Sequence, residues 1–178
     1  MIIINEPIWN KFRKIRKKTT IDILSKNYLF QDLTSKELKI LNAIVHERTY
    51  VKDEVIFRQN DTGVGMYIIS KGAVDIIAEN YEDRKMEETI IVTLNEDDFF
   101  GELSLIEENG KRSATARATF DTSLIGFFKP NLMEIMKMNP GIGVKITWRL
   151  CQVLGQRLKD TTDNLANVKQ QLSSQEVG

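Results

Sequence analysis

Histidine and cysteine are almost absent from this chain. Its 178 residues include one histidine, His46, and one cysteine, Cys151. A catalytic metal in a β-rich enzyme normally needs two or three imidazole ligands, and a disulfide framework needs paired cysteines. A Ser-His-Asp site would need a reactive serine beside His46, and nothing in its flanking sequence indicates one. We therefore expect no catalytic metal, no cofactor and no enzymatic activity.

Net charge and long apolar runs are also missing. Lys plus Arg and Asp plus Glu both number 25, so no overall electric field favours nucleic acid or an acidic surface. No apolar run has membrane-spanning length, and Met1–Ile4 is too short for the apolar core of a signal peptide. We expect a cytoplasmic protein without a transmembrane segment.

The N-terminal stretch departs locally from this balance. Residues 11–18 hold six basic side chains in eight positions. Apolar residues interleaved with them predict a basic helical extension over residues 1–27, with an amphipathic helix in Pro7–Lys26. Such a helix binds either an anionic membrane surface or, the interpretation we favour because its apolar stripe is short, its own protein.

A helix followed by a β domain is the predicted core of the chain. Thr34 and Glu37 form a capping-box pattern, which predicts a helix from about Ser35 to His46. From Arg48 to Phe128 short β-rich runs alternate with polar turns. The runs are RTYV, EVIFR, MYIIS, AVDIIAE, TIIVTL, SATARA and SLIGFF. This pattern predicts a mainly β domain over residues 28–139, an antiparallel jelly roll (a double-stranded β-helix) with flanking helices.

Two helices are expected at the C-terminal end. Residues 129–139 read as a short helix that stops before Pro140, and a long helix follows from about Gly141 to Leu172, within a segment of residues 140–178. One apolar stripe of the long helix, expected to pack on the β domain, comprises Ile142, Ile146, Leu150, Val153 and Arg157. The other has heptad spacing and comprises Thr147, Cys151, Leu154, Leu158, Thr161, Leu165, Val168 and Leu172.

The heptad stripe predicts a parallel homodimer through residues 147–172, because its leucines would otherwise face water. A solitary helix is the alternative. On this stripe Cys151 needs no role beyond that of a buried small hydrophobe.

Two charged residues stand at the ends of one loop in the β domain. Glu102 follows a glycine, and Arg112 begins a strand-like run. A buried arginine keeps its charge and needs an anion. The two residues could form an internal salt bridge with each other. Alternatively, a short helical turn starting at Gly101 and the Arg112 guanidinium bind a phosphate together, Ser113 adds a hydroxyl donor, and the Glu102 carboxylate accepts from a sugar hydroxyl.

The segment FFGELSL…KRSATARA resembles the phosphate-binding cassette of cyclic nucleotide-binding domains, and the likeness extends over roughly residues 28–167. The resemblance implies that Glu102 binds the ribose 2′-hydroxyl, Arg112 binds the cyclic phosphate, and the turn amides assist. By likeness to bacterial activator members of the family, adjacent threonines of the long helix reach the base, one from each subunit. The ligand-binding candidates are Gly101, Glu102, Leu103, Ser104, Arg112, Ser113, Ala114, Ile91, Leu94, Thr161 and Thr162.

The resulting hypothesis is a stand-alone regulatory module that binds cAMP, or less favourably cGMP, and acts through an unidentified effector protein. The activator members carry a helix-turn-helix after the long helix, and this sequence ends at Gly178, so we expect no DNA binding. An interaction protein of the same fold with a silent pocket, in which Glu102 and Arg112 pair with each other, is the alternative.

Overall fold

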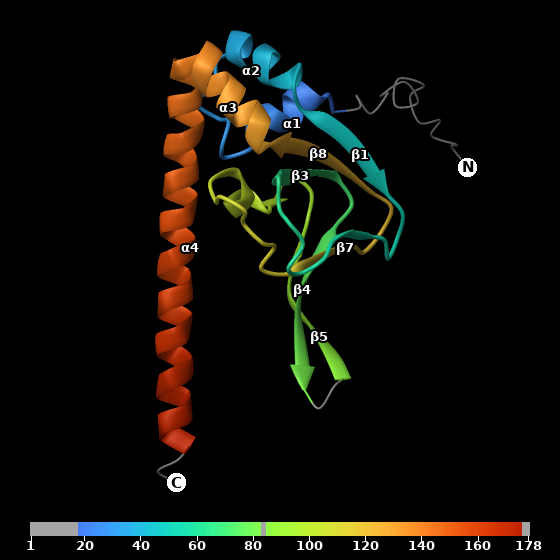
Figure 1. Ribbon diagram of the computed structural model, residues 1–178, viewed down its shortest axis with the longest axis vertical. Helices are drawn as coiled ribbons and strands as arrows, with labels where there is room; N and C mark the ends of the chain where they lie inside the picture. The colour runs from blue at the N-terminus through green and yellow to red at the C-terminus, as the bar shows by residue number, and fades with distance from the viewer. Residues whose placement is uncertain (1–17, 83–84, 176–178) are drawn as a thin grey trace, which may run out of the picture.

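The computed structural model describes residues 18–82 and 85–175, and it has eight strands between flanking helices within this part of the chain (Figure 1). One four-stranded antiparallel sheet has the order β1-β8-β3-β6 and the other has the order β2-β7-β4-β5. The strands are β1 (His46–Tyr50), β2 (Val55–Phe57), β3 (Gly65–Lys71), β4 (Val74–Glu82), β5 (Lys85–Leu94), β6 (Phe99–Phe100), β7 (Thr115–Ala118) and β8 (Thr122–Phe128). The predicted fold class, mainly β with flanking helices and a long C-terminal helix, is confirmed.

Two helices precede the sheets, α1 (Thr20–Lys26) and α2 (Ser35–Asn42). Both begin with a complete capping box, formed by Thr19 with Asp22 and by the predicted pair of Thr34 with Glu37. The predicted C-terminal end of α2 is wrong: the helix stops at Asn42, and His46 pairs with Gly126 in the β1–β8 ladder. Strand β6 was not predicted, because two residues are too few to show an alternating pattern.

The N-terminal helix α1 is part of the core. Ile23 and Leu24 are buried in one cluster with Phe30 and Ile146, and Ile21 packs against the same cluster. Within the expected helix Pro7–Lys26, the structure therefore places residues 20–26 against the protein itself. The expected continuous helix is wrong at Lys18 and Thr19, because Thr19 is the extended N-cap of α1. Residues 7–17 of the expected helix, with the basic segment except Lys18, lie outside the described residues.

The C-terminal helix α4 (Pro140–Gln175) follows α3 (Lys129–Met138) and is longer than predicted at both ends. Its first stripe is confirmed as the packing face, because Ile142, Ile146 and Leu150 are buried in the core cluster and Val153 packs against it. Beyond this region α4 and the β4–β5 hairpin extend from the body as two separate arms (Figure 1).

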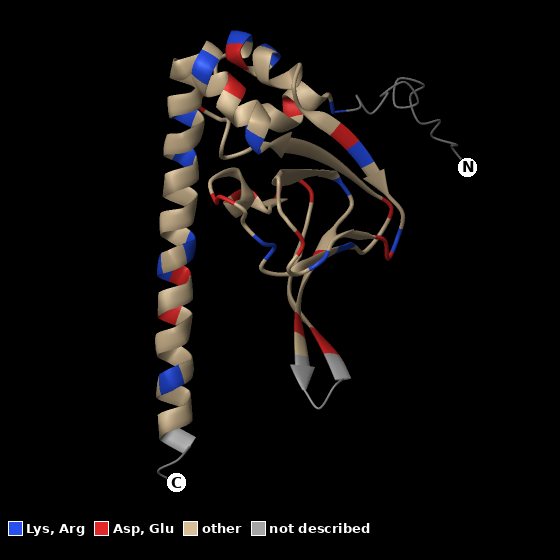
Figure 2. Ribbon diagram, viewed as in Figure 1, with Lys and Arg blue, Asp and Glu red and all other residues tan. Residues whose placement is uncertain are grey.

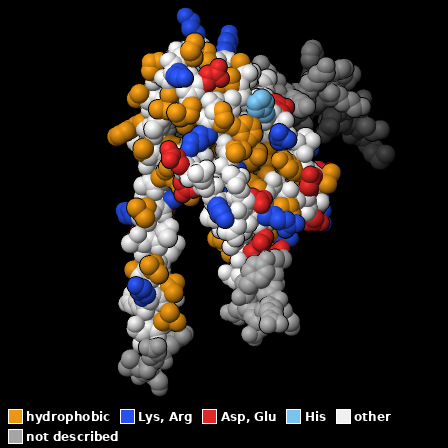
Figure 3. All heavy atoms as spheres, in the orientation of Figure 1, with side chains coloured by type: hydrophobic (Ala, Val, Ile, Leu, Met, Phe, Trp, Pro, Cys, Tyr) orange, Lys and Arg blue, Asp and Glu red, His pale blue; other side chains and the backbone are white. Residues whose placement is uncertain are grey.

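The heptad stripe of α4 has little cover within the single chain. Leu158 is 70% exposed, Leu165, Val168 and Leu172 are also exposed, and hydrophobic side chains continue along the projecting arm (Figure 3). Cys151, expected to be buried, is exposed in the single chain. No helix in the described ranges, 18–82 and 85–175, is long and apolar enough to cross a membrane.

Two ion pairs join α4 to α2 and to the loop between α1 and α2, where basic residues of α4 lie level with the N-terminal helices (Figure 2). The Lys145 Nζ lies 2.8 Å from a Glu37 carboxylate oxygen, and the Arg149 Nε lies 2.6 Å from an Asp32 oxygen. Hydrogen bonds from the Lys145 side chain and from the Thr34 backbone lower the pKa of Glu37 to about 2. The ion pairs therefore fix the first turns of α4 against the body.

Replacing Lys145 by glutamine tests this contact. A carboxyl group with a depressed folded-state pKa stabilises the fold above its unfolded pKa, and this contribution is lost as the pH falls through the folded pKa. We expect Lys145→Gln to lower the melting temperature by a few degrees at pH 7 and to match the wild type near pH 2, as measured by circular dichroism. Lys159→Gln is the control on the projecting part of α4, and an equal deficit at both pH values would contradict the assignment.

Candidate ligand-binding site

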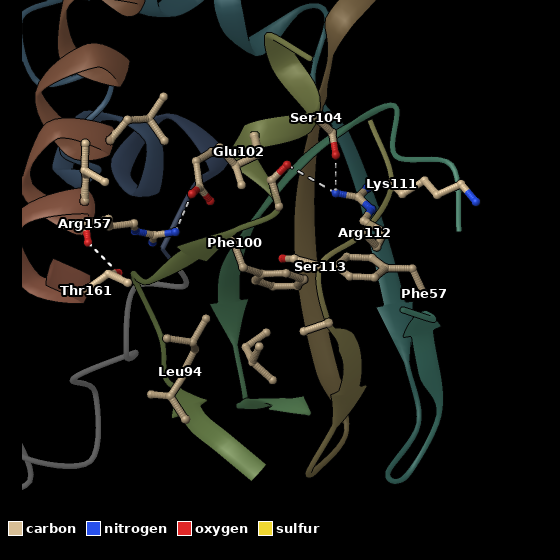
Figure 4. Close-up of a pocket in the computed structure, with 17 residues that line it drawn as sticks. Phe57, Leu94, Phe100, Glu102, Ser104, Lys111, Arg112, Ser113, Arg157 and Thr161 are labelled. Atoms are coloured by element: carbon tan, nitrogen blue, oxygen red, sulfur yellow. Dashed lines mark hydrogen bonds and ion pairs between the residues drawn. The ribbon is translucent and has the colours of Figure 1, made fainter. Parts of the chain in front are cut away.

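A pocket of about 590 Å³ is lined by residues from both sheets and from α4, and it contains most of the predicted site residues (Figure 4). Its walls come from β2, β4, β5, β6, the short 3₁₀ helix η2 (Glu102–Leu105), the segment just before β7 and α4. The lining residues are Phe57, Ile76, Val92, Leu94, Phe100, Gly101, Glu102, Leu103, Ser104, Lys111, Arg112, Ser113, Ala114, Leu154, Arg157, Leu158 and Thr161.

Arg112 brings a positive charge into the protein without a counter-charge bonded to it. The residue is 6% exposed, and burial lowers the pKa of its guanidinium. Its Nη1 donates to the Gly101 carbonyl at 3.2 Å and to Ser104 Oγ at 2.9 Å, while its buried Nε has no partner. Among the described residues no carboxylate forms an ion pair with it. A buried cation bonded only to neutral acceptors is costly, so the site is suited to an anion.

The turn that begins the 3₁₀ helix η2, which lines the pocket, depends on Gly101. Gly101 has a φ of 76°, in the left-handed region, and a Cβ atom there would overlap Nη1 of Arg112. The expected helical turn is present as η2. Its Ser104 amide already donates to the Gly101 carbonyl at 3.2 Å, so the outward donors are expected from the residues before Ser104.

Glu102 pairs with a residue of the C-terminal helix and not with Arg112. It is 3% exposed, and Arg157 of α4 donates to its carboxylate. The internal salt bridge considered from the sequence, Glu102 with Arg112, is therefore wrong. Arg157 was predicted only as part of the packing stripe, because residues 55 positions apart in sequence give no sign that they meet. The pair joins the cassette directly to α4.

The far end of the pocket, away from Arg112, is mostly apolar. The predicted residues Leu94 and Thr161 line it, together with Ile76 and Val92. Ile91 does not line it: the side chain is 61% exposed, and its neighbour Val92 takes the inner position because alternate strand residues face opposite sides.

The adjacent residues Thr161 and Thr162 of α4 also divide between two faces. The Thr161 side chain lines the pocket and that of Thr162 does not. In the single chain both hydroxyls donate to helix carbonyls one turn earlier, those of Arg157 and Leu158.

Several lining residues were missed in the sequence analysis. Phe57 and Phe100 come from different sheets, so their approach to Arg112 depends on the packing of the two sheets. Leu154 and Leu158 had been assigned only to the heptad stripe. Alternation along β4 and β5 is the one available signal, and it would have identified Ile76 and Val92 as inward-facing.

The sequence model of the cyclic nucleotide-binding domain matches residues 47–139, just over half of the chain, and the chain belongs to this family. It is 28% identical over 132 residues to the cyclic AMP receptor protein of Thermus thermophilus, covering 74% of this chain and 57% of that protein. It is 33% identical over 116 residues to a cAMP-dependent protein kinase regulatory subunit of Candida albicans, covering 65% and 23%.

The fold comparison agrees with the sequence comparison. The crystal structure of the Thermus thermophilus catabolite activator protein superposes with a TM-score of 0.69 at 26% identity, over 80% of this chain and 63% of that one. The chain spans 55–60% of the length of the curated bacterial relatives that it matches. The family resemblance inferred from the cassette motif is confirmed.

Substituting Gly101 tests the close approach of the turn to Arg112. We expect Gly101→Ala to cost about 1–2 kcal/mol of unfolding free energy, because alanine disfavours the left-handed conformation and its methyl group displaces the guanidinium. Chemical denaturation measures this loss. Gly141→Ala is the matched control, since a Cβ there would meet nothing within 4 Å. Equal effects of the two substitutions would refute the tight contact.

Proposed function

We propose that this protein is a regulatory receptor for a cyclic mononucleotide, with cAMP favoured over cGMP, and that it has no enzymatic activity. The observation that carries the proposal is Arg112, a buried guanidinium that borders a 590 Å³ pocket and has only neutral partners. A cyclic phosphate supplies the missing anion, and a nucleoside fills the remaining, mainly apolar volume. The name of the Thermus relative supports cAMP.

In the proposal, different residues of the pocket bind the phosphate, the ribose and the base of the ligand. Arg112 and the hydroxyl of Ser113 bind the phosphate with the first amides of the turn. Glu102 accepts from the ribose 2′-hydroxyl, because an ionised carboxylate offers only acceptors. Val92, Leu94 and Thr161 lie where the base would pack. Ser113 weakly favours cGMP, because its hydroxyl also suits the guanine amino group.

The Glu102–Arg157 ion pair gives ligand binding a route to the long helix. A ribose hydroxyl bound to the Glu102 carboxylate would share it with Arg157 or replace that contact. Either change alters how α4 sits against the cassette, so the ligand shifts the population of α4 positions. The expected output is altered binding of an effector protein in the cytoplasm, without direct DNA contact by the residues in this chain.

A parallel homodimer through residues 147–172 completes the proposal. It would cover the exposed leucines of α4, and Thr162 of one chain would reach the base in the pocket of its partner. In this arrangement Thr161 and Thr162, which face different sides of one helix, contact two different ligands.

Calorimetry with cAMP and cGMP tests the binding proposal. We expect saturable cAMP binding to protein shown to be free of nucleotide. Arg112→Ala should weaken it at least about a hundredfold, since two charge-assisted hydrogen bonds are lost. Arg117→Ala is the matched control on β7, the strand that follows Arg112, because Arg117 pairs with Glu88 outside the pocket. Unchanged affinity in Arg112→Ala would remove this residue from the site, and no binding of either nucleotide would support the silent-pocket alternative.

The single cysteine reports on the proposed dimer. In a parallel two-stranded helix, Cys151 of one chain faces Cys151 of the other, so mild oxidation should join the two thiols as a disulfide. We expect a covalent dimer on a non-reducing gel, with Cys151→Ser as the control that stays monomeric on the gel but dimeric in sedimentation velocity. A wild-type chain that sediments as a monomer at tens of micromolar would rule out this dimer.

A further inference from the structure

The position of the Arg112 guanidinium is set by groups of the protein itself. An arginine side chain has several rotatable bonds, and ordering it costs rotamer entropy. Its one carboxylate neighbour in the pocket, Glu102, is paired with Arg157. Other groups therefore hold the guanidinium where the phosphate is expected.

One such group is the ring of Phe57. The guanidinium carbon of Arg112 lies 4.0 Å from the ring centroid, which is within range of a cation–π contact. The ring is itself buttressed, with Tyr67 at 6.2 Å and Phe100 at 5.8 Å between centroids. Strand β2 places Phe57 opposite Ala116 of β7, the strand that follows Arg112. The pairing of β2 with β7 therefore brings the Phe57 ring close to Arg112, which lies just before β7.

Ser104 and Gly63 limit the guanidinium on its other sides. The Ser104 hydroxyl accepts from Nη1, and it lies on the opposite side of the guanidinium from the Phe57 ring (Figure 4). A Cβ atom at Gly63 would overlap the Ser104 hydroxyl and lie 3.1 Å from Nε. With Nη1 bound by the protein and Nε enclosed, Nη2 is the remaining donor for an incoming anion, since it has no hydrogen-bond acceptor among the described residues.

We infer that Phe57 is a positioning residue for the ligand-binding arginine: its ring, with Ser104 and Gly63, forms a cage that fixes Arg112 before the ligand arrives. The function of the cage rests on the proposed cyclic nucleotide binding, but its existence in the free protein does not. The ring face partly offsets the buried charge without occupying the hydrogen-bond donors that the phosphate needs. A carboxylate in the same place would neutralise the cation and compete with the ligand.

The inference distinguishes an aromatic face from mere apolar volume. Phe57→Leu keeps an apolar side chain but removes the π-system, whereas Phe57→Tyr keeps the ring. We expect Phe57→Leu to weaken cAMP binding about three- to thirtyfold, the range of cation–π contacts, and Phe57→Tyr to remain within about twofold of the wild type. Phe128→Leu is the control, because it removes a ring of the same aromatic cluster that faces Tyr67 and does not line the pocket.

A spectroscopic measurement on the nucleotide-free protein gives an independent readout. The Arg112 Nε–H signal, assigned by its loss in Arg112→Lys, should show restricted guanidinium rotation and a ring-current shift in the wild type and in Phe57→Tyr. Both features should be lost in Phe57→Leu. Melting temperatures identify any variant whose fold is damaged, and Ser104→Ala then provides a second probe that should also loosen the Arg112 signal while leaving the ring in place.

The outcomes separate the cage from the proposed function. Equal affinity of Phe57→Leu and the wild type, or equal losses in Phe57→Leu and Phe57→Tyr, would overturn the positioning role. A freely rotating guanidinium in the wild type would overturn the cage itself. If the wild type binds no cyclic nucleotide but the Arg112 signal behaves as expected, the proposed function fails and the cage stands.

Discussion

The burial of one positive charge governs the structure of the site. Arg112 is almost fully enclosed, and burial lowers the pKa of its guanidinium, yet the residue cannot discharge at neutral pH. Its surroundings are arranged around that constraint: a left-handed glycine that lets the turn approach, a serine hydroxyl that accepts one donor, and an aromatic ring beneath the plane. Since no carboxylate in the part of the chain that the structure describes forms an ion pair with Arg112, an added anion would balance its charge, as the proposed function requires.

The second feature that organises the molecule is the long helix. Its first turns are fixed to α1, α2 and the loop between them by buried apolar residues and by ion pairs, and its middle is joined to the cassette through Arg157 and Glu102. The last turns project from the body. The helix therefore passes from a fixed part, through a part in contact with the candidate ligand site, to a free part. This order suits an element that transmits a local change over a distance.

Much of this arrangement could be predicted from the sequence because it is encoded locally. The capping box of Thr34 and Glu37 marked the start of α2, short β-rich runs between polar turns gave seven of the strands, and the motif FFGELSL…KRSATARA identified the cassette by resemblance. The contacts missed are those that depend on packing between distant segments. No sequence pattern joins Arg157 to Glu102 or places Phe57 under Arg112. Ile91 was predicted as an apolar contact together with Leu94, but alternate strand residues face opposite sides, so Val92 and not Ile91 shares the inner face of β5 with Leu94.

The wall that α4 contributes to the pocket has a further consequence. Leu154, Leu158 and Thr161 line the cavity, and the same three residues belong to the heptad stripe. In the proposed assembly, self-association and nucleotide occupancy thus act on one helix surface and are thermodynamically reciprocal. Whatever free energy the nucleotide adds to pairing of the chains, pairing adds to retention of the nucleotide, so the sensitivity of the receptor would vary with its own abundance.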